Sequence, residues 1–135
     1  MITNFAANKI LDYNFGSASY SIPTTWYIGL STTTINQDGL GVTEPVGAGY
    51  LRVGVANNKA TGFSTAGLSK LYNLQQISFL ESTASWGTIT YVFLSDAQTG
   101  GNIWFFEALN PSRQVGGQTQ VIFPATKLEI NFTNS

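Results

Sequence analysis

Residues 81–109, ESTASWGTITYVFLSDAQTGGNIWFFEAL, carry the strongest local signal in the sequence. Two segments, TITYVFLS (88–95) and NIWFFEAL (102–109), have the length and the β-branched and aromatic content of strands. Asp96 and two glycines lie between them, and these residue types favour turn conformations and positive φ. The stretch therefore predicts a β-hairpin.

This hairpin is apolar on both faces. Its strands contain apolar runs such as VFL and IWFF in place of a clean alternation, so the pattern does not specify which face is buried. We expect Tyr91, Phe93 and Trp104 to lie in the interior or at a seam between copies. Apolarity on two faces is typical of strands covered on both sides, and a neighbouring subunit is one candidate for the second cover.

Further patterns flank the hairpin. Apolar residues alternate along YLRVGVA (50–56), as in a strand with one buried face. Near the start of the chain, Thr3 can cap a short helix over residues 3–15, and Gly16 can end it. Residues 110–120, NPSRQVGGQTQ, favour a turn. The remaining strand patterns cover residues 24–31, 75–81, 120–124 and 126–132.

Together these elements predict a mainly β fold, an antiparallel β-sandwich or barrel with a short N-terminal α-helix. The chain has 135 residues, a common length for one domain. No repeat or linker divides it, so we expect residues 1–135 to form a single domain.

Composition excludes several classes of partner. Only 10% of the residues are charged, the net charge is −1, and the six basic residues are scattered, so we expect no nucleic-acid binding. The N-terminal segment lacks a basic stretch followed by an apolar run, and no 18 apolar residues occur together; we expect neither a signal peptide nor a membrane span. Because cysteine is absent, disulfides and thiolate metal sites are excluded.

Catalysis would have to use carboxylates, since the chain has neither histidine nor cysteine. Two carboxylates that are distant in sequence could still flank a glycosidic bond, which keeps an enzyme acting on cell-wall sugars as a third hypothesis. Glu107 and Glu129, however, lie within strand patterns as solvated outer-face residues. We therefore expect no enzymatic activity, no catalytic residue and no cofactor.

Two short segments resemble metal-binding turns. Asn36-Gln37-Asp38-Gly39 resembles the start of a calcium loop but lacks the later ligands, which favours an ordinary turn. Asp96, which precedes two glycines, is explained by capping of its own turn. We expect no metal site.

The three tryptophans raise the possibility of sugar binding, because an indole face can stack on a pyranose ring. Trp26 and Trp104 lie in mid-strand, where core packing is expected. Trp86 precedes Gly87 at the start of a strand and fits either environment. Trp86 and Asp96 are therefore the candidate glycan contacts in that alternative.

Apolar residues also occur in the two long connections, residues 32–49 and 57–74, and in the helix pattern. They have two interpretations: they cover the ends of the sandwich, or they form an interface that is buried only in an assembly. The candidate assembly residues are Phe5, Ile10, Ile35, Leu40, Val42, Val46, Phe63, Leu68 and Tyr72.

Over roughly residues 5–132, the chain resembles a family of small structural proteins of tailed bacteriophages, labelled as tail fibre proteins, minor virion proteins or head decoration proteins. The similar elements are the N-terminal helix, WYIGLST (26–32) with the following loop, GAGYLRVGV (47–55), and above all the S-W-G (85–87) and D-x-x-x-G-G (96–101) elements. Where family members often have histidine or isoleucine in the central strand, this chain has Tyr91 and Phe93. The resemblance implies a small β-sandwich or barrel and supplies no catalytic residue.

From this resemblance we expect a non-enzymatic virion protein, in the first place a capsid decoration (cement) protein. Its expected partners are the major capsid protein and copies of itself, as a homotrimer, since binding to the assembled shell alone would stabilise that shell. The alternative is a tail fibre or baseplate component that binds host glycans. In both cases the expected location is the virion, assembled in the host cytoplasm.

Overall fold

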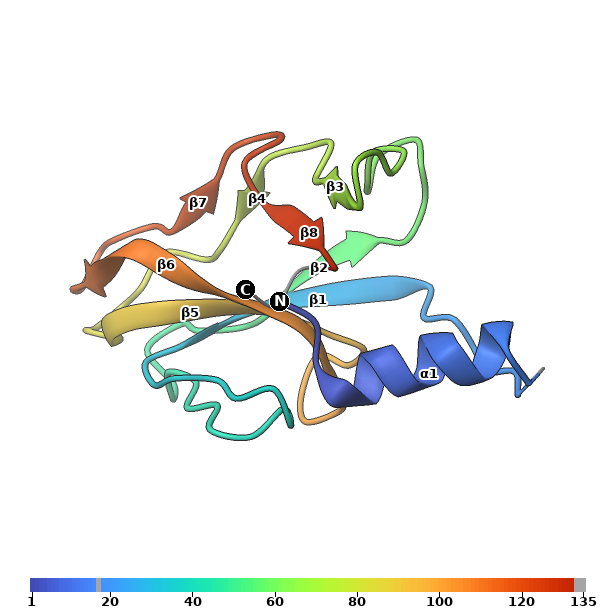
Figure 1. Ribbon diagram of the computed structural model, residues 1–135. Helices are drawn as coiled ribbons and strands as arrows, with labels where there is room; N and C mark the ends of the chain where they lie inside the picture. The colour runs from blue at the N-terminus through green and yellow to red at the C-terminus, as the bar shows by residue number, and fades with distance from the viewer. Residues whose placement is uncertain (17, 133–135) are drawn as a thin grey trace.

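The computed structural model describes residues 1–16 and 18–132 (Figure 1). It confirms a mainly β fold with antiparallel sheets and a short N-terminal helix. The elements are α1 (Asn4–Asn14), β1 (Thr25–Ser31), β2 (Val53–Ala56), β3 (Lys70–Tyr72), β4 (Ile77–Ser78), β5 (Gly87–Ser95), β6 (Ile103–Val115), β7 (Ile122–Phe123) and β8 (Glu129–Asn131). Within the described residues, no helix is long and apolar enough to cross a membrane.

The predicted hairpin is present as β5–β6 and forms one side of a four-stranded antiparallel sheet with the order β2-β1-β5-β6. Phe93 pairs with Phe106 and Leu94 with Phe105 across the hairpin. On its other side β5 pairs with β1, where Gly29 lies opposite Phe93. The apolar hairpin therefore supplies one inner strand, β5, and one edge strand, β6, of the main sheet.

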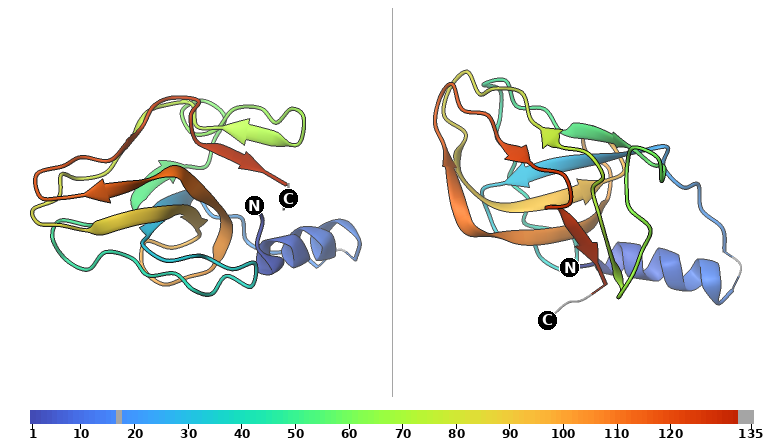
Figure 2. Two further views of the ribbon diagram at one scale, coloured as in Figure 1. Left: turned by 60° about the vertical axis from the view of Figure 1, so that its left-hand side comes forward. Right: turned by 90° about the horizontal axis from the view of Figure 1, so that it is seen from above.

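Two small antiparallel ribbons, β3–β8 and β4–β7, lie over one face of this sheet, as Figures 1 and 2 show. The main core fills the space between these layers. The sheet contributes apolar side chains such as Ile28, Val92 and Leu94, and the ribbons and their flanks contribute Ile77, Phe79, Val121 and Leu128. The arrangement is that of a sandwich, and the described strands form no closed barrel.

The opposite face of the sheet is covered by the same chain. Phe93 and Phe106 pack on that face with Ile35 from the loop after β1. Trp104 packs against Ile2 and Ala6 at the start of the chain and also against Trp26, which borders the main core. The second cover of the hairpin, for which a neighbouring subunit was a candidate, is thus intramolecular. The two-sided apolarity of β5 and β6 results from a core on each side of one sheet.

Helix α1 begins where the sequence predicts. The Thr3 side chain accepts a hydrogen bond from the amide of Ala6, which is the usual capping interaction. The same hydroxyl donates to the carbonyl of Ile103, 2.7 Å away, and so fixes the helix start to β6. Ile2 also forms a β-bridge with Phe105. Residues 1–3 therefore cover the otherwise open edge of β6.

Some strand bounds differ from the predictions. Strand β6 continues to Val115, so most of the predicted turn over residues 110–120 is strand instead. Pairing with β5 is irregular at this point: Ala108 pairs with Tyr91, but the next pair is Arg113 with Ile89. Because β6 is an edge strand, this irregular segment can accommodate Pro111 without loss of a central ladder bond.

The ribbons are shorter than their patterns, and β3 lies within the connection over residues 57–74, where the sequence predicts no strand. The turn before β3 places Leu68 and Ser69 at positive φ, 55° and 63°. Neither residue type favours that conformation, which explains why the sequence gives no clear signal for a hairpin there.

Candidate functional site

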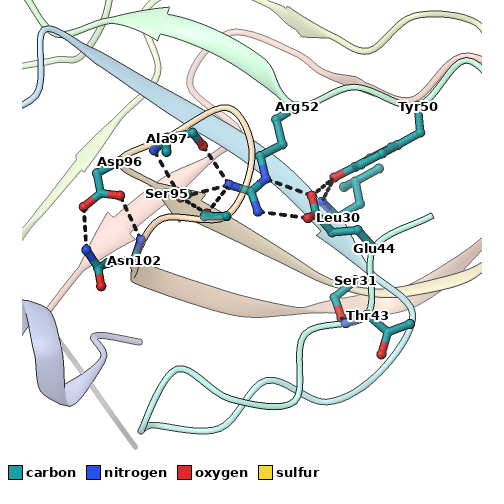
Figure 3. A network of polar contacts seen from close by, with 11 residues as sticks. Leu30, Ser31, Thr43, Glu44, Tyr50, Arg52, Ser95, Asp96, Ala97 and Asn102 are labelled. Carbon is teal, nitrogen blue, oxygen red and sulfur yellow. Dashed lines mark hydrogen bonds and ion pairs between the residues drawn. The ribbon is translucent and has the colours of Figure 1, made fainter. Parts of the chain in front are cut away.

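A polar network holds the loop over residues 32–49 against the β5–β6 turn (Figure 3). Arg52 is buried; its Nε and Nη2 each donate to a different carboxylate oxygen of Glu44, at 2.9 Å. Its Nη1 donates to Ser95 Oγ at 3.0 Å and to the carbonyls of Ala97 and Gly100 at 2.7 and 2.9 Å. The guanidinium also lies over the Phe93 ring, 5.1 Å from the ring centroid. One side chain thus connects the loop to the turn.

Glu44 is the carboxylate that neutralises the charge of Arg52 in this network. Burial alone would raise the pKa of its carboxyl, but hydrogen bonds from Arg52 and Tyr50 outweigh that effect and hold the pKa below its usual value. The hydroxyl of Tyr50 donates to Glu44 at 2.6 Å and accepts from the amide of Leu30 at 3.0 Å. Burial, and then the bond to Glu44, raise the pKa of Tyr50. Among the described residues, no buried side-chain nitrogen or oxygen lacks a hydrogen-bond partner, so we interpret the network as a structural clamp.

The loop itself is fixed by further hydrogen bonds. Ser31 Oγ accepts from the amide of Thr43 at 3.0 Å, and the amide of Thr32 donates to the carbonyl of Thr43 at 2.9 Å. At its tip Asp38 Oδ1 accepts from the amide of Leu40 at 2.9 Å, which is an ordinary Asx turn. The long connection is therefore a structural cover for the second core.

The two candidate glycan contacts do not form a shared surface. Trp86 is only 5% exposed, and its indole Nε1 donates to the carbonyl of Ala48 at 2.9 Å, so neither indole face is free for a sugar ring. Asp96 accepts from the amide of Asn102 at 2.8 Å and from Trp104 Nε1 at 3.1 Å. Trp86 lies before β5 and Asp96 after it, so the full strand separates them. Burial and turn capping explain these two residues.

Hydrogen bonds set the ionisation of Asp96. Partial burial would raise the pKa of its carboxyl, but the donors from Asn102 and Trp104 hold it below the usual value. The charge stabilises the turn that the Arg52 side chain also contacts.

The candidate assembly residues fall into three groups by burial. Ile35 and Phe63 are buried in the two cores, which agrees with the other interpretation, that these residues cover the ends of the sandwich. Phe5, Ile10, Val42 and Tyr72 are half-buried. Leu40, Val46 and Leu68 are exposed, Val46 to 96%.

The far end of α1 exposes apolar residues that are not among the candidate assembly residues. Leu11 and Phe15 are exposed there, Phe15 to 84%, and Ile22 is exposed in the segment that follows the helix. In the ribbon views this end of α1 projects beyond the sheet (Figures 1 and 2). Leu11 and Phe15 are four residues apart, which places them on the same side of the helix end and away from buried Ala6. This i, i+4 spacing is the sequence signal that could have identified them as exposed apolar neighbours.

An open apolar groove of about 370 Å³ lies between the sheet and the β3–β8 ribbon. The sheet side contributes Trp26, Leu94 and Phe105, and the ribbon side contributes Leu71, Ile130 and Phe132. Lys59, Lys70 and three asparagines also line the groove. Its volume lies within the range of ligand-binding clefts. No sequence pattern predicts this groove, because its walls come from segments that are far apart in the chain.

A second cavity, of about 410 Å³, is more polar and brings Glu107 and Glu129 to the same place. Each carboxylate already has a cation: Glu107 lies 3.2 Å from the N-terminal amine of Met1, and Glu129 lies 3.7 Å from Lys70 Nζ. Both side chains are exposed. These are two surface ion pairs on neighbouring elements.

Comparison with protein families gives one result. Residues 1–131 match the model of a family described as Podophage GP4 fiber I protein gp80. No curated protein is significantly similar to the chain. The match agrees with the elements noted in the sequence, and its length includes the helix, all eight strands and both cores. The chain therefore belongs to this family of phage virion structural proteins.

Proposed function

We propose that this chain is a non-enzymatic component of a fibre on the tail of a bacteriophage, and that it functions by assembling with other virion proteins. The family description, which names a fibre protein, supports this location. The observation that carries the assembly role is the far end of α1, where Leu11 is 53% exposed and Phe15, which directly follows the helix, is 84% exposed. Exposed apolar side chains that cluster on a projecting element are typical of protein–protein contacts.

A structural role also fits the chemistry of the surface. The strongest polar network, around Arg52 and Glu44, is used to hold the loop to the β5–β6 turn. Glu107 and Glu129, the two carboxylates that share a cavity, are each paired with a cation.

Glycan recognition is not part of this proposal. The residues that suggested it, Trp86 and Asp96, are used in core packing and turn capping. The groove between the sheet and the β3–β8 ribbon is walled mainly by apolar side chains, which suits an apolar partner better than a sugar.

The capsid decoration role predicts a different place in the virion, and the number of copies per particle separates the two. Quantitative mass spectrometry of purified virions would compare this protein with the major capsid protein, and gold-labelled antibodies would locate it. A fibre component should be present at a small fraction of the capsid protein's copy number, with label at the tail. A copy number close to that of the capsid protein, with label over the head, would replace the fibre proposal by decoration.

A further inference from the structure

We propose that Asp38 is a site of self-catalysed modification, where the side chain forms a cyclic imide with the backbone nitrogen of Gly39 and converts slowly to isoaspartate in the folded protein. The pair lies at the tip of the connection over residues 32–49 and is the only Asp-Gly sequence in the chain. No asparagine is followed by glycine, so the sequence offers no competing amide site of this kind. The modification needs no partner and no enzyme, and it is therefore independent of the fibre proposal.

The reaction is an intramolecular acyl transfer followed by hydrolysis. The nitrogen of Gly39 attacks Cγ of the protonated Asp38 side chain, a C–N bond forms, and the carboxyl hydroxyl leaves as water with the amide proton. Water then adds to one of the two imide carbonyls. Cleavage between the nitrogen and Cγ returns aspartate. Cleavage between the nitrogen and the main-chain carbonyl carbon gives isoaspartate, in which the chain runs through Cγ and the α-carboxylate is free. The water released is consumed again, so the net reaction is an isomerisation.

The Asp38 carboxyl group has the freedom that this attack requires. Asp38 is exposed, and its Oδ1 accepts a hydrogen bond from the amide of Leu40 at 2.9 Å. Among the described residues, the other carboxylate oxygen has no hydrogen-bond partner. The Asx turn folds the carboxyl group forward along the chain, on the side of the Gly39 peptide. One exposed hydrogen bond is therefore the only restraint on this side chain.

Gly39 supplies an unobstructed nucleophile. Its φ is 82°, and a Cβ at this position would meet no atom within 4 Å. Any other residue would place a side chain beside the attacking nitrogen, and glycine does not. The N–H of Gly39 donates to the carbonyl of Asn36 at 2.9 Å, and this bond must open before the attack. Because the bond lies at an exposed loop tip, it can open locally without disturbing either core.

Asp12 lacks these conditions. It is followed by Tyr13, and both residues lie within α1, where each amide donates to the carbonyl four residues earlier. An attack on the Asp12 side chain would require this helical bond to break and the backbone to leave its helical conformation. The helix therefore protects Asp12.

Asp96 is protected by its own hydrogen bonds. Its Oδ1 accepts from the amide of Asn102 at 2.8 Å, and its Oδ2 accepts from Asn102 Nδ2 and Trp104 Nε1, each at 3.1 Å. The amide of Ala97, which would have to attack, donates instead to Ser95 Oγ at 3.3 Å. The carboxyl group is thus held toward the far side of its turn and away from the next peptide.

The fold can accommodate the product. Isoaspartate adds a methylene group to the backbone of the loop tip, but the loop is anchored on both sides of that tip. Ile35 is buried in the second core, and the amide of Thr43 donates to Ser31 Oγ at 3.0 Å. The change is therefore confined to residues 36–40, next to the exposed side chain of Leu40.

The decisive experiment places two Asp-Gly pairs in one chain. Ala97→Gly gives Asp96 the same following residue as Asp38, while the hydrogen bonds to the Asp96 carboxylate remain. The folded variant, verified by circular dichroism, would be incubated near neutral pH, digested and analysed by mass spectrometry with electron-transfer fragmentation, which distinguishes isoaspartate from aspartate. Isoaspartate should accumulate at least about tenfold faster at residue 38 than at residue 96, because misplaced reacting groups lose at least this factor. In urea the two rates should converge.

The wild type and two variants of residue 38 complete the test. The folded wild type should gain isoaspartate at residue 38 and not at Asp12 or Asp96. Asp38→Glu should lose the total signal measured with an isoaspartyl methyltransferase, because glutamate would need a larger ring. Asp38→Asn forms the same imide with loss of ammonia and supplies the reference peptide.

Three results would overturn the inference: no isoaspartate at residue 38 in the folded wild type, equal rates at residues 38 and 96 in folded Ala97→Gly, or an unchanged total signal in Asp38→Glu. None of these measurements involves the virion copy number, so the fibre proposal would stand or fall separately.

Discussion

Arg52 and Glu44 form a two-pronged ion pair, with Nε and Nη2 of the arginine each 2.9 Å from a different oxygen of the carboxylate. The remaining nitrogen of Arg52 donates to the carbonyls of Ala97 and Gly100 beyond β5. Residues from two connections, 32–49 and 96–102, are thereby held by one buried guanidinium. The loop that covers the second core owes its position to this pair.

Glu44→Gln should destabilise the protein by about 3 kcal/mol, because it leaves the Arg52 charge buried without a counter-charge. Urea denaturation at pH 7 would measure the loss. Glu81→Gln is the control, since Glu81 is exposed and its replacement should stay within about 0.5 kcal/mol of wild type. Equal stability of the two variants would show that the pair does not hold the loop.

The ion pair of Arg52 and Glu44 should make the free energy of unfolding decrease as the pH is lowered. The pKa of Glu44 is lower in the folded state than in the unfolded chain, so its contribution is complete above about pH 5 and is lost as the pH falls through the folded-state value. Asp96, whose folded pKa is also lowered, adds to the effect in the same direction. Denaturation midpoints measured from pH 7 to pH 3 should therefore fall less steeply in Glu44→Gln than in wild type. An identical pH profile would contradict this assignment.

Gly29→Ala should destabilise the protein by about 1–3 kcal/mol through overpacking. A Cβ at residue 29 would lie 2.2 Å from Cζ of Phe93, and the ring is buried with Phe106 and Ile35 and cannot simply move away. Gly116→Ala, with open space around the added methyl group, should be close to neutral. In the Gly29→Ala/Phe93→Leu double variant the smaller side chain should recover part of the loss. Thermal unfolding of the wild type, Gly29→Ala, Phe93→Leu and the double variant would give the coupling.

Most of the fold could be predicted from local patterns. The Thr3 cap, the hairpin with its Asp and Gly turn, and the strand before residue 32 each have a short-range signal, and each is present. A short N-terminal helix followed by a series of strands also predicts the fold class, a mainly β fold with antiparallel sheets. By contrast, β3 is three residues long and follows two residues at positive φ, so its pairing with β8 depends on tertiary contacts that no local pattern records.

The candidate site was much less predictable. Whether a loop residue such as Ile35 or Val46 is buried depends on which part of the chain passes above it, and periodicity does not contain that information. The groove shows the same limit, since Trp26, Phe63 and Phe105 come together only after the two layers pack. The exposed end of α1 did have a signal in the spacing of Leu11 and Phe15, but its meaning required knowing that Ala6 faces the sheet.

Trp86 gives a test that separates a core residue from a ligand contact. Its indole is buried, stands edge-to-face against Tyr50 with 5.3 Å between ring centroids, and donates to the carbonyl of Ala48. Trp86→Ala should therefore destabilise the protein by about 3–5 kcal/mol, as expected for a large cavity in a core.

The conservative variant Trp86→Phe keeps most of the apolar contact but removes the indole N–H, which leaves the carbonyl of Ala48 without this donor. It should destabilise the protein by about 1 kcal/mol. Val46→Ala, at a 96% exposed position, is the control and should change stability by less than about 0.5 kcal/mol. All three would be compared by chemical denaturation at pH 7. If both Trp86 variants were as stable as the control, the indole would not be part of the core, and its use as a surface contact would have to be reconsidered.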